Sequence, residues 1–174
     1  MSVRKIVLLG DPILRQKAKK VSRFDDSIRQ LVSDMVDTMR EAPGVGLAAP
    51  QVGVPLRIAV VEVDDEVTVL CNPEISEMEG EWEPEEGCLS IPGYVANVKR
   101  AERIVVRAKN ERGKPIKIKA DGMLAHVCQH EIDHLDGILF IDRLASPDLL
   151  RKVPERREEE EEAEGAATET ASAV

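Results

Sequence analysis

The chain has 174 residues, which is enough for one domain with a hydrophobic core. Its formal net charge of −9 is concentrated near the C-terminus, because residues 158–169 contain seven acidic side chains and no basic one. Subtracting these seven charges leaves about −2 on residues 1–157, which argues against a basic nucleic-acid-binding face and against a membrane-binding surface.

The three cysteines, Cys71, Cys88 and Cys128, are too few and too odd in number for a disulfide framework, so a reducing compartment is expected. An apolar run of four residues precedes Gly10, which is far too short for a signal peptide or a membrane span. These features predict a cytoplasmic enzyme. An organellar stroma or matrix is the alternative if a presequence was removed before Met1.

The first predicted element is a helix from Asp26 to Glu41, because its apolar residues recur at intervals of three and four. Asp25 or Asp26 would cap it, and Pro43-Gly44 would end it. The glycine-rich stretch 44–53 is too broken for a helix of its own. Two strands are then expected, at 56–63 and 67–70, with the acidic residues 64–66 as the turn between them.

Extended segments follow at 75–82 and 104–109, and residues 114–120 alternate apolar with lysine, as a half-buried strand does. A second helix is predicted from Met123 to Leu135, ended by Asp136-Gly137. This order of elements indicates an α+β domain over residues 1–153. Residues 154–174 are acidic and lack apolar periodicity, which predicts a disordered tail.

The segment QHEIDHLDG, residues 129–137, carries the strongest chemical signal. His130 and His134 lie four residues apart, so on a helix their Cα atoms are separated by roughly 6 Å along the axis and by only about 40° around it. Both imidazoles can therefore bind one metal ion. Glu131 follows the first histidine and can take a proton from a water bound to that ion.

A catalytic ion of this kind needs a third protein ligand and one open position. His126 is about 12 Å along the helix axis from His134, so one straight helix does not bring it to the same ion. Downstream acidic residues (Asp136, Asp142, Asp148) have no distinctive setting. Cys88 lies between Gly87 and the Pro92-Gly93 turn, and a thiolate is a good ligand for a divalent transition metal, so it is the preferred candidate. Cys71 and Cys128 are expected in the core.

A third chemical feature is the small-residue loop GVGLAAPQ, residues 44–51, which ends in Gln51. The loop lacks the lysine of a phosphate-binding loop and the third glycine of a dinucleotide-binding one. Its small side chains would let a ligand lie against the backbone. The amide of Gln51 could then donate a hydrogen bond to a developing oxyanion.

Together the three segments resemble the peptide deformylase family, whose motifs GxGxAAxQ, EGCxS and HExDH are matched here by GVGLAAPQ, EGCLS and HEIDH. The similarity extends from about Val3 to about Leu144 and includes the early segment GDPILR. The resemblance implies antiparallel β-sheets packed around a central helix that carries HExDH. It also implies removal of the N-formyl group from the initiator methionine of nascent polypeptides, with release of formate.

The resemblance further implies a role for each matching residue. The metal ligands would be Cys88, His130 and His134, with Fe2+ as the physiological ion and Zn2+, Ni2+ or Co2+ as substitutes. A hydroxide on the metal would attack the formyl carbon. Glu131 would act as general base and acid, and Gln51 with the backbone N–H of Leu89 would form the oxyanion hole. The substrate-binding residues would be Val45 and Gly46 along the peptide backbone, and His126 and Val127 at the edge of the methionine pocket.

Supporting contacts and partners complete these expectations. Glu86 and Arg100 would pair beside the Cys88 loop, as an exposed and therefore weak ion pair. Asp133 would either orient a ligand histidine or face solvent. The protein is expected to be a monomer without a membrane partner or a sequence-specific nucleic-acid partner. Contact with the ribosome near the exit tunnel stays open, because the family's basic C-terminal helix has an acidic counterpart here.

Two alternatives share parts of this pattern. An HExxH metallopeptidase has the same helix but takes its third ligand downstream of it. A non-catalytic protein with a structural metal generally closes its site with four protein ligands. The sequence offers three good ligands, and a structural metal site would not need Glu131. Both points favour the hydrolase.

Overall fold

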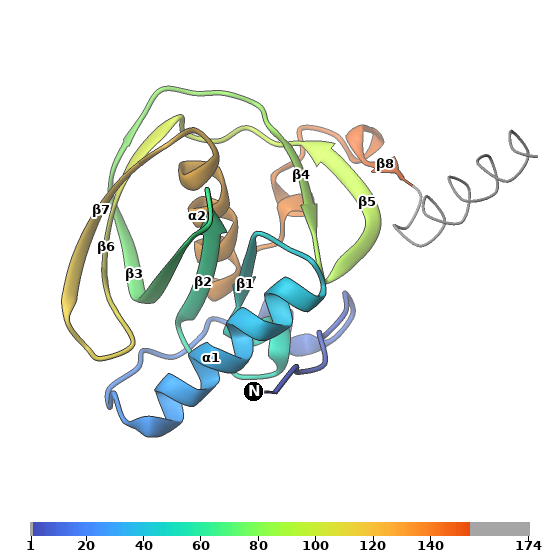
Figure 1. The fold of residues 1–174 in the computed structure, drawn as a ribbon. Coiled ribbons are helices and arrows are strands. Elements are labelled where there is room, and N and C mark those ends of the chain that lie inside the picture. Colours follow the sequence, from blue (N-terminus) through green and yellow to red (C-terminus); the bar gives the residue numbers. More distant parts are fainter. Residues whose placement is uncertain (1, 154–174) are drawn as a thin grey trace, which may run out of the picture.

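The computed structural model describes residues 2–153, so the tail predicted for residues 154–174 lies outside the described residues. Two antiparallel sheets lie on either side of helix α2 (Gly122–Leu135), as Figure 1 shows. The larger sheet has the order β1 (Gly46–Ala48), β2 (Ile58–Val63), β3 (Glu66–Glu79), β6 (Arg103–Lys109) and β7 (Pro115–Asp121). The smaller sheet has the order β4 (Glu85–Cys88), β5 (Ile91–Asn97) and β8 (Arg151–Lys152). The predicted α+β architecture is confirmed.

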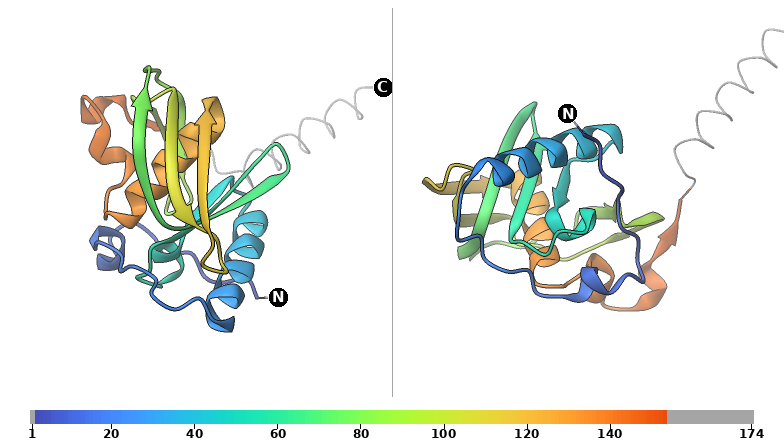
Figure 2. Two further views of the ribbon diagram at one scale, coloured as in Figure 1. Left: turned by 90° about the vertical axis from the view of Figure 1, so that its left-hand side faces the viewer. Right: turned by 90° about the horizontal axis from the view of Figure 1, so that it is seen from below.

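Helix α1 (Asp26–Glu41) begins and ends where the apolar periodicity predicts. The Asp25 carboxylate accepts hydrogen bonds from the backbone N–H groups of Ser27 and Ile28, which otherwise have no partner in the first turn. Met35 and Met39 on its inner face are fully buried against the sheet. The helix therefore covers one face of β1 and β2, as Figure 2 shows.

Strand β2 is buried on both faces because it lies between two helices. Ile58 and Val60 belong to the apolar cluster that contains the α1 residues, whereas Ala59 and Val61 belong to the cluster that contains the α2 residues. Alternating side chains of a strand point to opposite faces. A continuous apolar run such as this one is the expected result.

Helix α2 (Gly122–Leu135) runs along the other face of the larger sheet and is almost completely buried from Ala125 onward. It ends at Asp136, and Gly137 adopts a φ of +73°. A Cβ atom on Gly137 would lie 2.6 Å from the carbonyl oxygen of Arg15, so only glycine fits there. The helix buries six polar side chains, which is costly unless they bind one another or a ligand: His126, Gln129, His130, Glu131, Asp133 and His134.

Several strands differ from the sequence expectations. Residues 67–70 and 75–82 were expected as separate extended segments, but β3 runs from Glu66 to Glu79 through two irregularities in its pairing with β6. Asn72 makes the bend possible, because it adopts a φ of +51° and its side chain binds the backbone of Val21. The glycine-rich stretch contains β1 and a 3-10 helix, η2 (Ala49–Val52), and the strands β4, β5 and β8 were not expected at all.

None of the helices within residues 2–153 combines the length and the apolar character that crossing a bilayer requires.

Candidate metal centre

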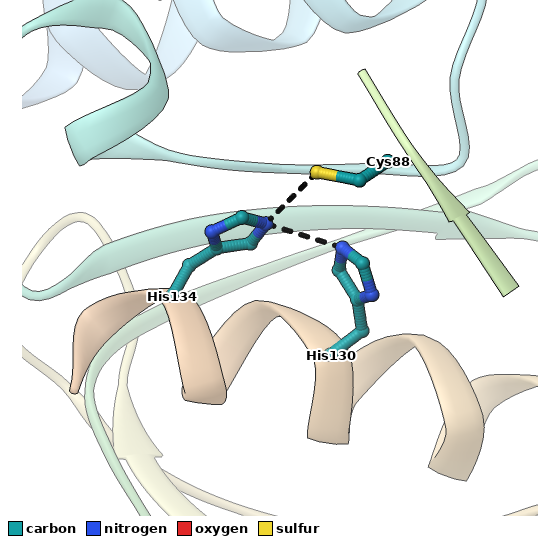
Figure 3. Close-up of side chains that lie close together, drawn as sticks. All are labelled: Cys88, His130 and His134. Atoms are coloured by element: carbon teal, nitrogen blue, oxygen red, sulfur yellow. Dashed lines mark hydrogen bonds between the residues drawn. The ribbon is translucent and has the colours of Figure 1, made fainter. Parts of the chain in front are cut away.

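The three predicted ligands meet at one point, as Figure 3 shows. The Sγ atom of Cys88 lies 3.4 Å from Nε2 of His134, and that nitrogen lies 3.1 Å from Nε2 of His130. All three donor atoms lie within 4.8 Å of one another. Cys88 lies at the end of β4, and both histidines lie on one face of α2. The i, i+4 spacing therefore brings the two imidazoles together, as the sequence predicts.

The donor set fits a divalent transition metal. One sulfur and two imidazole nitrogens are ligands that Zn2+ and its neighbours favour. Within residues 2–153 this is the only cluster of three or more His, Cys, Asp or Glu side chains close enough to bind one ion. Three protein ligands leave a coordination position for water or substrate, as in catalytic sites.

Two of the three acidic candidates downstream of the helix are engaged elsewhere, and the third, Asp148, is exposed and lies outside the ligand cluster. Asp136 binds Arg57 at 2.9 Å, and Asp142 pairs with Arg15 and accepts from the backbone N–H of Leu139. A third ligand of the HExxH peptidase type is therefore not assembled. The other cysteines are buried in the apolar clusters, as expected, and burial raises the pKa of Cys71 and of Cys128 to about 12.

Glu86 orients His130, one of the predicted ligands. Its Oε1 atom lies 2.5 Å from Nδ1 of His130, so this nitrogen donates its proton to the carboxylate and Nε2 keeps its lone pair for an ion. Burial opposes ionisation of Glu86, but hydrogen bonds from His126, His130 and Arg100 outweigh it and hold the pKa of the carboxyl far below its ordinary value. The sequence predicted the contact of Glu86 with Arg100 but missed its contact with His130.

The Glu86–Arg100 ion pair differs from the expected one in its surroundings. It was expected at the surface, yet Glu86 is 3% and Arg100 is 4% exposed. Arg100 donates from Nε at 2.9 Å and from Nη2 at 2.5 Å to the two carboxylate oxygens. A buried, two-bonded pair of this kind fixes the carboxylate in a plane, whereas an exposed pair would not.

Asp133 has neither of the two positions expected for it. It is 7% exposed, so it does not face solvent, and its carboxylate binds Arg100 and Arg143 and not a histidine. The spacing of three residues from His130 places Asp133 beside the predicted metal ligands but leaves its partner undetermined. Two guanidinium groups from outside the helix decide its orientation.

The pKa values of the two predicted ligand imidazoles, His130 and His134, are shifted in opposite directions. Burial opposes protonation of His130, but hydrogen bonds with Cys88 and Glu86 outweigh it and raise its pKa well above the ordinary value. Burial and the neighbouring charge of His130 lower the pKa of His134 well below it. A histidine binds a metal ion through an unprotonated nitrogen, so an ion in this cluster would have to displace a proton from His130 but not from His134.

Glu131 is a buried carboxyl group beside the ligands. Its side chain is 3% exposed, and Oε2 has no hydrogen-bond partner among the described residues. Burial is the main cause that raises its pKa to about 7, opposed by the charge of His130. A group that gains and loses a proton near neutral pH suits general acid–base chemistry.

Gly46 on β1 makes room for this carboxyl group. A Cβ atom on Gly46 would lie 2.5 Å from Oε1 of Glu131 and 2.9 Å from Cγ1 of Val127. Real Cβ contacts are longer, so any side chain at position 46 would displace one of these groups. The glycine is required by the close approach of β1 to α2, and it places the strand backbone at the edge of the site.

The amide of Gln51 has a fixed orientation. Its Oε1 accepts from the backbone N–H of Ala48 at 2.9 Å, and its Nε2 donates to Oγ of Ser90 at 3.0 Å. Nε2 also lies 3.6 Å from Sγ of Cys88. The NH2 group is therefore directed to the sulfur side of the site. Ser90, which is fully buried, was not predicted from the sequence.

A cavity of about 360 Å³ opens beside these groups. Its rim includes Val45 and Met123, which are each 52% exposed, and its lining contains every predicted substrate-binding residue: Val45, Gly46, His126 and Val127. His126 is more than an edge of this cavity, because its Nε2 lies 3.0 Å from Oε2 of Glu86. One carboxylate thus binds both a cavity residue and a predicted metal ligand, His130.

Comparisons with known proteins agree with this geometry. A family model described as "Polypeptide deformylase" matches residues 3–149. The peptide deformylase of Dictyoglomus thermophilum is 54% identical over 147 residues, which covers 84% of this chain and 96% of the relative. A crystal structure of a peptide deformylase from Legionella pneumophila superposes with a TM-score of 0.80 at 50% identity, covering 83% of this chain and 87% of that one.

A further solved structure, of a peptide deformylase from Synechococcus elongatus in complex with actinonin, superposes with a TM-score of 0.79 at 47% identity. It covers 81% of this chain and 78% of the other.

Proposed function

Because the chain belongs to the peptide deformylase family, we propose that Cys88, His130 and His134 hold one divalent metal ion and that Glu131 moves the protons of the reaction. The chain is a hydrolase that removes the N-formyl group from the N-terminal methionine of new polypeptides and releases formate. The observation that carries the proposal is the convergence of one sulfur and two imidazoles beside the buried carboxyl group of Glu131, whose Oε2 has no hydrogen-bond partner within residues 2–153.

The ion would be Fe2+, with Zn2+, Ni2+ or Co2+ as functional substitutes. When bound, it supplies Lewis-acid chemistry that activates water and polarises a carbonyl group. Cys88 would hold the ion as a thiolate and would donate charge to it, which supports an iron form that is sensitive to air. Loading the metal-free protein with each ion under argon and measuring turnover tests this choice, and an inactive Fe2+ form would overturn it.

The remaining steps belong to the side chains of the site. Glu131 takes the proton of the attacking water and delivers it to the amine that leaves. The amide of Gln51 and the backbone N–H of Leu89 stabilise the oxyanion that forms at the formyl carbon. The backbone at Val45 and Gly46 holds the peptide, and His126 with Val127 borders the methionine side chain.

Two alternative functions receive less support. A peptidase of the HExxH type would take an acidic ligand downstream of α2, but Asp136 and Asp142 bind arginines. A structural metal site would use a fourth protein ligand, and within residues 2–153 the cluster has three.

The proposed function is tested by formate release from a formyl-methionyl peptide with protein purified without oxygen, with its metal content measured alongside. We expect formate in proportion to bound metal, and loss of activity on chelation that the ion restores. Cleavage of internal peptide bonds without formate release would contradict the proposal.

We also propose a cytoplasmic monomer that acts on nascent chains near the ribosomal exit tunnel. Sedimentation equilibrium at micromolar concentration should give the monomer mass. Co-sedimentation with ribosomes carrying formylated nascent chains tests the second part, and its absence at low salt would contradict ribosome docking.

Replacing Gly46 with alanine is expected to lower kcat by up to about 10²-fold, because the new Cβ atom forces the Glu131 carboxyl group away by roughly 1 Å. Metal content should stay that of the unmodified protein, since the three atoms nearest to a Cβ at position 46 belong to Glu131 and Val127 and not to a ligand residue. Steady-state kinetics and metal analysis check both statements. A kcat within twofold of the unmodified protein would mean that the strand relaxes at no cost to Glu131.

Replacing Gln51 with methionine is expected to lower kcat by about 10²–10³-fold, the usual effect of removing one oxyanion donor. The variant also leaves the backbone N–H of Ala48 without its acceptor, so some stability is lost. Gln129→Met is the matched control, because the Gln129 amide also binds backbone groups, those of Ala101, but does not line the cavity. Equal losses of kcat in both variants would assign Gln51 a purely structural role.

A further inference from the structure

A line of alternating charges leads from the molecular surface to the ligand His130. At its outer end, Arg143 grips Asp133 with two hydrogen bonds, from Nε to Oδ2 at 2.5 Å and from Nη2 to Oδ1 at 2.7 Å. Oδ2 of Asp133 also accepts from Nη1 of Arg100 at 2.7 Å. Asp133 is therefore shared by two guanidinium groups.

At the inner end of the line, Arg100 holds the carboxylate that orients the ligand. Its remaining donors, Nε and Nη2, bind the two oxygens of Glu86, and Oε1 of Glu86 binds Nδ1 of His130. The plane of the Arg100 guanidinium is thus set by two carboxylates at once. A shift at Asp133 changes the donor geometry that Arg100 offers to Glu86.

Because Arg100, Glu86 and Asp133 are buried, their geometry is sensitive to the loss of Arg143. The side chains of Arg100 and Glu86 are 3% and 2% exposed and that of Asp133 is 10% exposed, whereas that of Arg143 is 43% exposed. The two carboxylates are balanced by two guanidinium groups. Without Arg143, the buried Arg100 alone would face both, and a buried carboxylate that lacks a counter-charge is costly enough to draw Arg100 towards Asp133.

We propose that Arg143 is a positioning residue for the metal ligand His130 and acts through Asp133, Arg100 and Glu86. Arg143 lies on the 3-10 helix η3 (Phe140–Arg143), outside all three sequence motifs, and touches no ligand atom. This inference rests on the proposed function, since it concerns the ion that His130 would hold. The short helix η3 would then help to orient a ligand of the metal site.

The chain offers a matched control for a purely structural ion pair. Arg40 binds Glu62 with two hydrogen bonds of 3.0 and 2.9 Å, and its side chain is 54% exposed, close to the exposure of Arg143. Arg40 lies on α1 and Glu62 on β2, and neither belongs to the ligand cluster. Arg40→Met therefore removes a similar ion pair without touching the line of charges.

The test compares Arg143→Met, Arg143→Lys and Arg40→Met in the Co2+-loaded protein. The readouts are the Co2+ dissociation constant by chelator competition and the paramagnetically shifted Nδ1–H proton of His130 in the NMR spectrum. We expect Arg143→Met to weaken Co2+ binding by about 3–10-fold, below the roughly 10–100-fold known for direct outer-shell partners. The His130 proton should shift and exchange faster with water, and kcat should fall with KM unchanged.

The sign of the affinity change separates positioning from simple charge. Removing a positive charge near a cation strengthens binding through Coulomb's law alone, so weaker binding reports the loss of geometry. Arg143→Lys keeps the charge but loses the two-bonded contact with Asp133. Its Co2+ affinity should therefore lie between that of the unmodified protein and that of Arg143→Met. It also serves as the test variant if Arg143→Met does not fold.

The proposal is overturned if the Arg143 variants keep the Co2+ affinity and the His130 resonance of the unmodified protein, or if Arg40→Met changes both to the same extent. Tighter Co2+ binding in Arg143→Met would also overturn it. These outcomes concern the variants alone, so the proposed function stands as long as the unmodified protein releases formate. An unmodified protein that releases no formate would instead overturn the proposed function.

Discussion

Replacing Glu131 with glutamine is expected to lower kcat for a formyl-methionyl peptide by about 10²–10⁴-fold, the usual range for loss of a general acid–base group. The amide has nearly the shape of the carboxyl group it replaces, so the cavity should keep its form. It can neither take a proton from water nor return it to an amine. Because Glu131 is not one of the three clustered ligands, metal content should be unchanged.

Glu131→Asp is the matched control for this prediction. It keeps a carboxyl group but withdraws it by one methylene, so kcat should fall less than in the glutamine variant. Steady-state kinetics with metal analysis on the same preparations provides the measurement. A glutamine variant with its metal and with full formate release would remove Glu131 from the chemistry.

Replacing Cys88 with alanine is expected to weaken metal binding by at least about 10²-fold and to abolish deformylation at ordinary metal concentrations. Four-ligand zinc sites bind with about 10–16 kcal/mol, or about 3 kcal/mol per ligand. The loss should exceed that of any replacement outside the ligand cluster. Metal retention after dialysis, followed by formate release with and without added metal, provides the measurement.

Cys71→Ala is the matched control for the cysteine variant. Cys71 is fully buried in the apolar cluster beside α1, and its pKa of about 12 keeps it a neutral thiol. Its replacement should cost some stability and leave the metal in place. If both variants kept their metal, the sulfur ligand would have to be abandoned and the peptidase alternative would gain support.

The local parts of the site could be predicted from the sequence because they depend on one periodicity. His130 and His134 lie on one face of a helix wherever that helix packs, and the bounds of α2 differ from the predicted ones by a single residue at the start. Helix α1 could be predicted for the same reason. Cys88 was identified by its turn and by family resemblance, since its distance from the helix depends on the tertiary fold.

The parts that could not be predicted depend on contacts between distant segments. Strand β4 is only four residues long and carries little alternation, so its pairing with β5 leaves no local signal. The same holds for Glu86, whose neighbours in the sequence do not indicate that it binds His130, 44 residues away. Exposure was also misjudged for the Glu86–Arg100 pair, because charged residues are buried only when a tertiary network compensates them.

Asp133 and Arg143 show the same limit most clearly. Helical spacing placed Asp133 near the ligands and left open whether it would bind a histidine or face water. Its actual partners come from the loop before β6 and from η3, whose positions no periodicity encodes. A buried aspartate is costly unless cations or donors compensate it, and only the fold determines which groups do so.

X-ray absorption at the zinc edge of the Zn2+-loaded protein tests the central claim most directly, because it reports the ligand atoms themselves. We predict one sulfur at about 2.3 Å and two imidazole nitrogens at about 2.0–2.1 Å, with the sulfur signal lost in Cys88→Ala protein loaded with excess zinc. A spectrum of the unmodified protein without a sulfur neighbour would contradict the account.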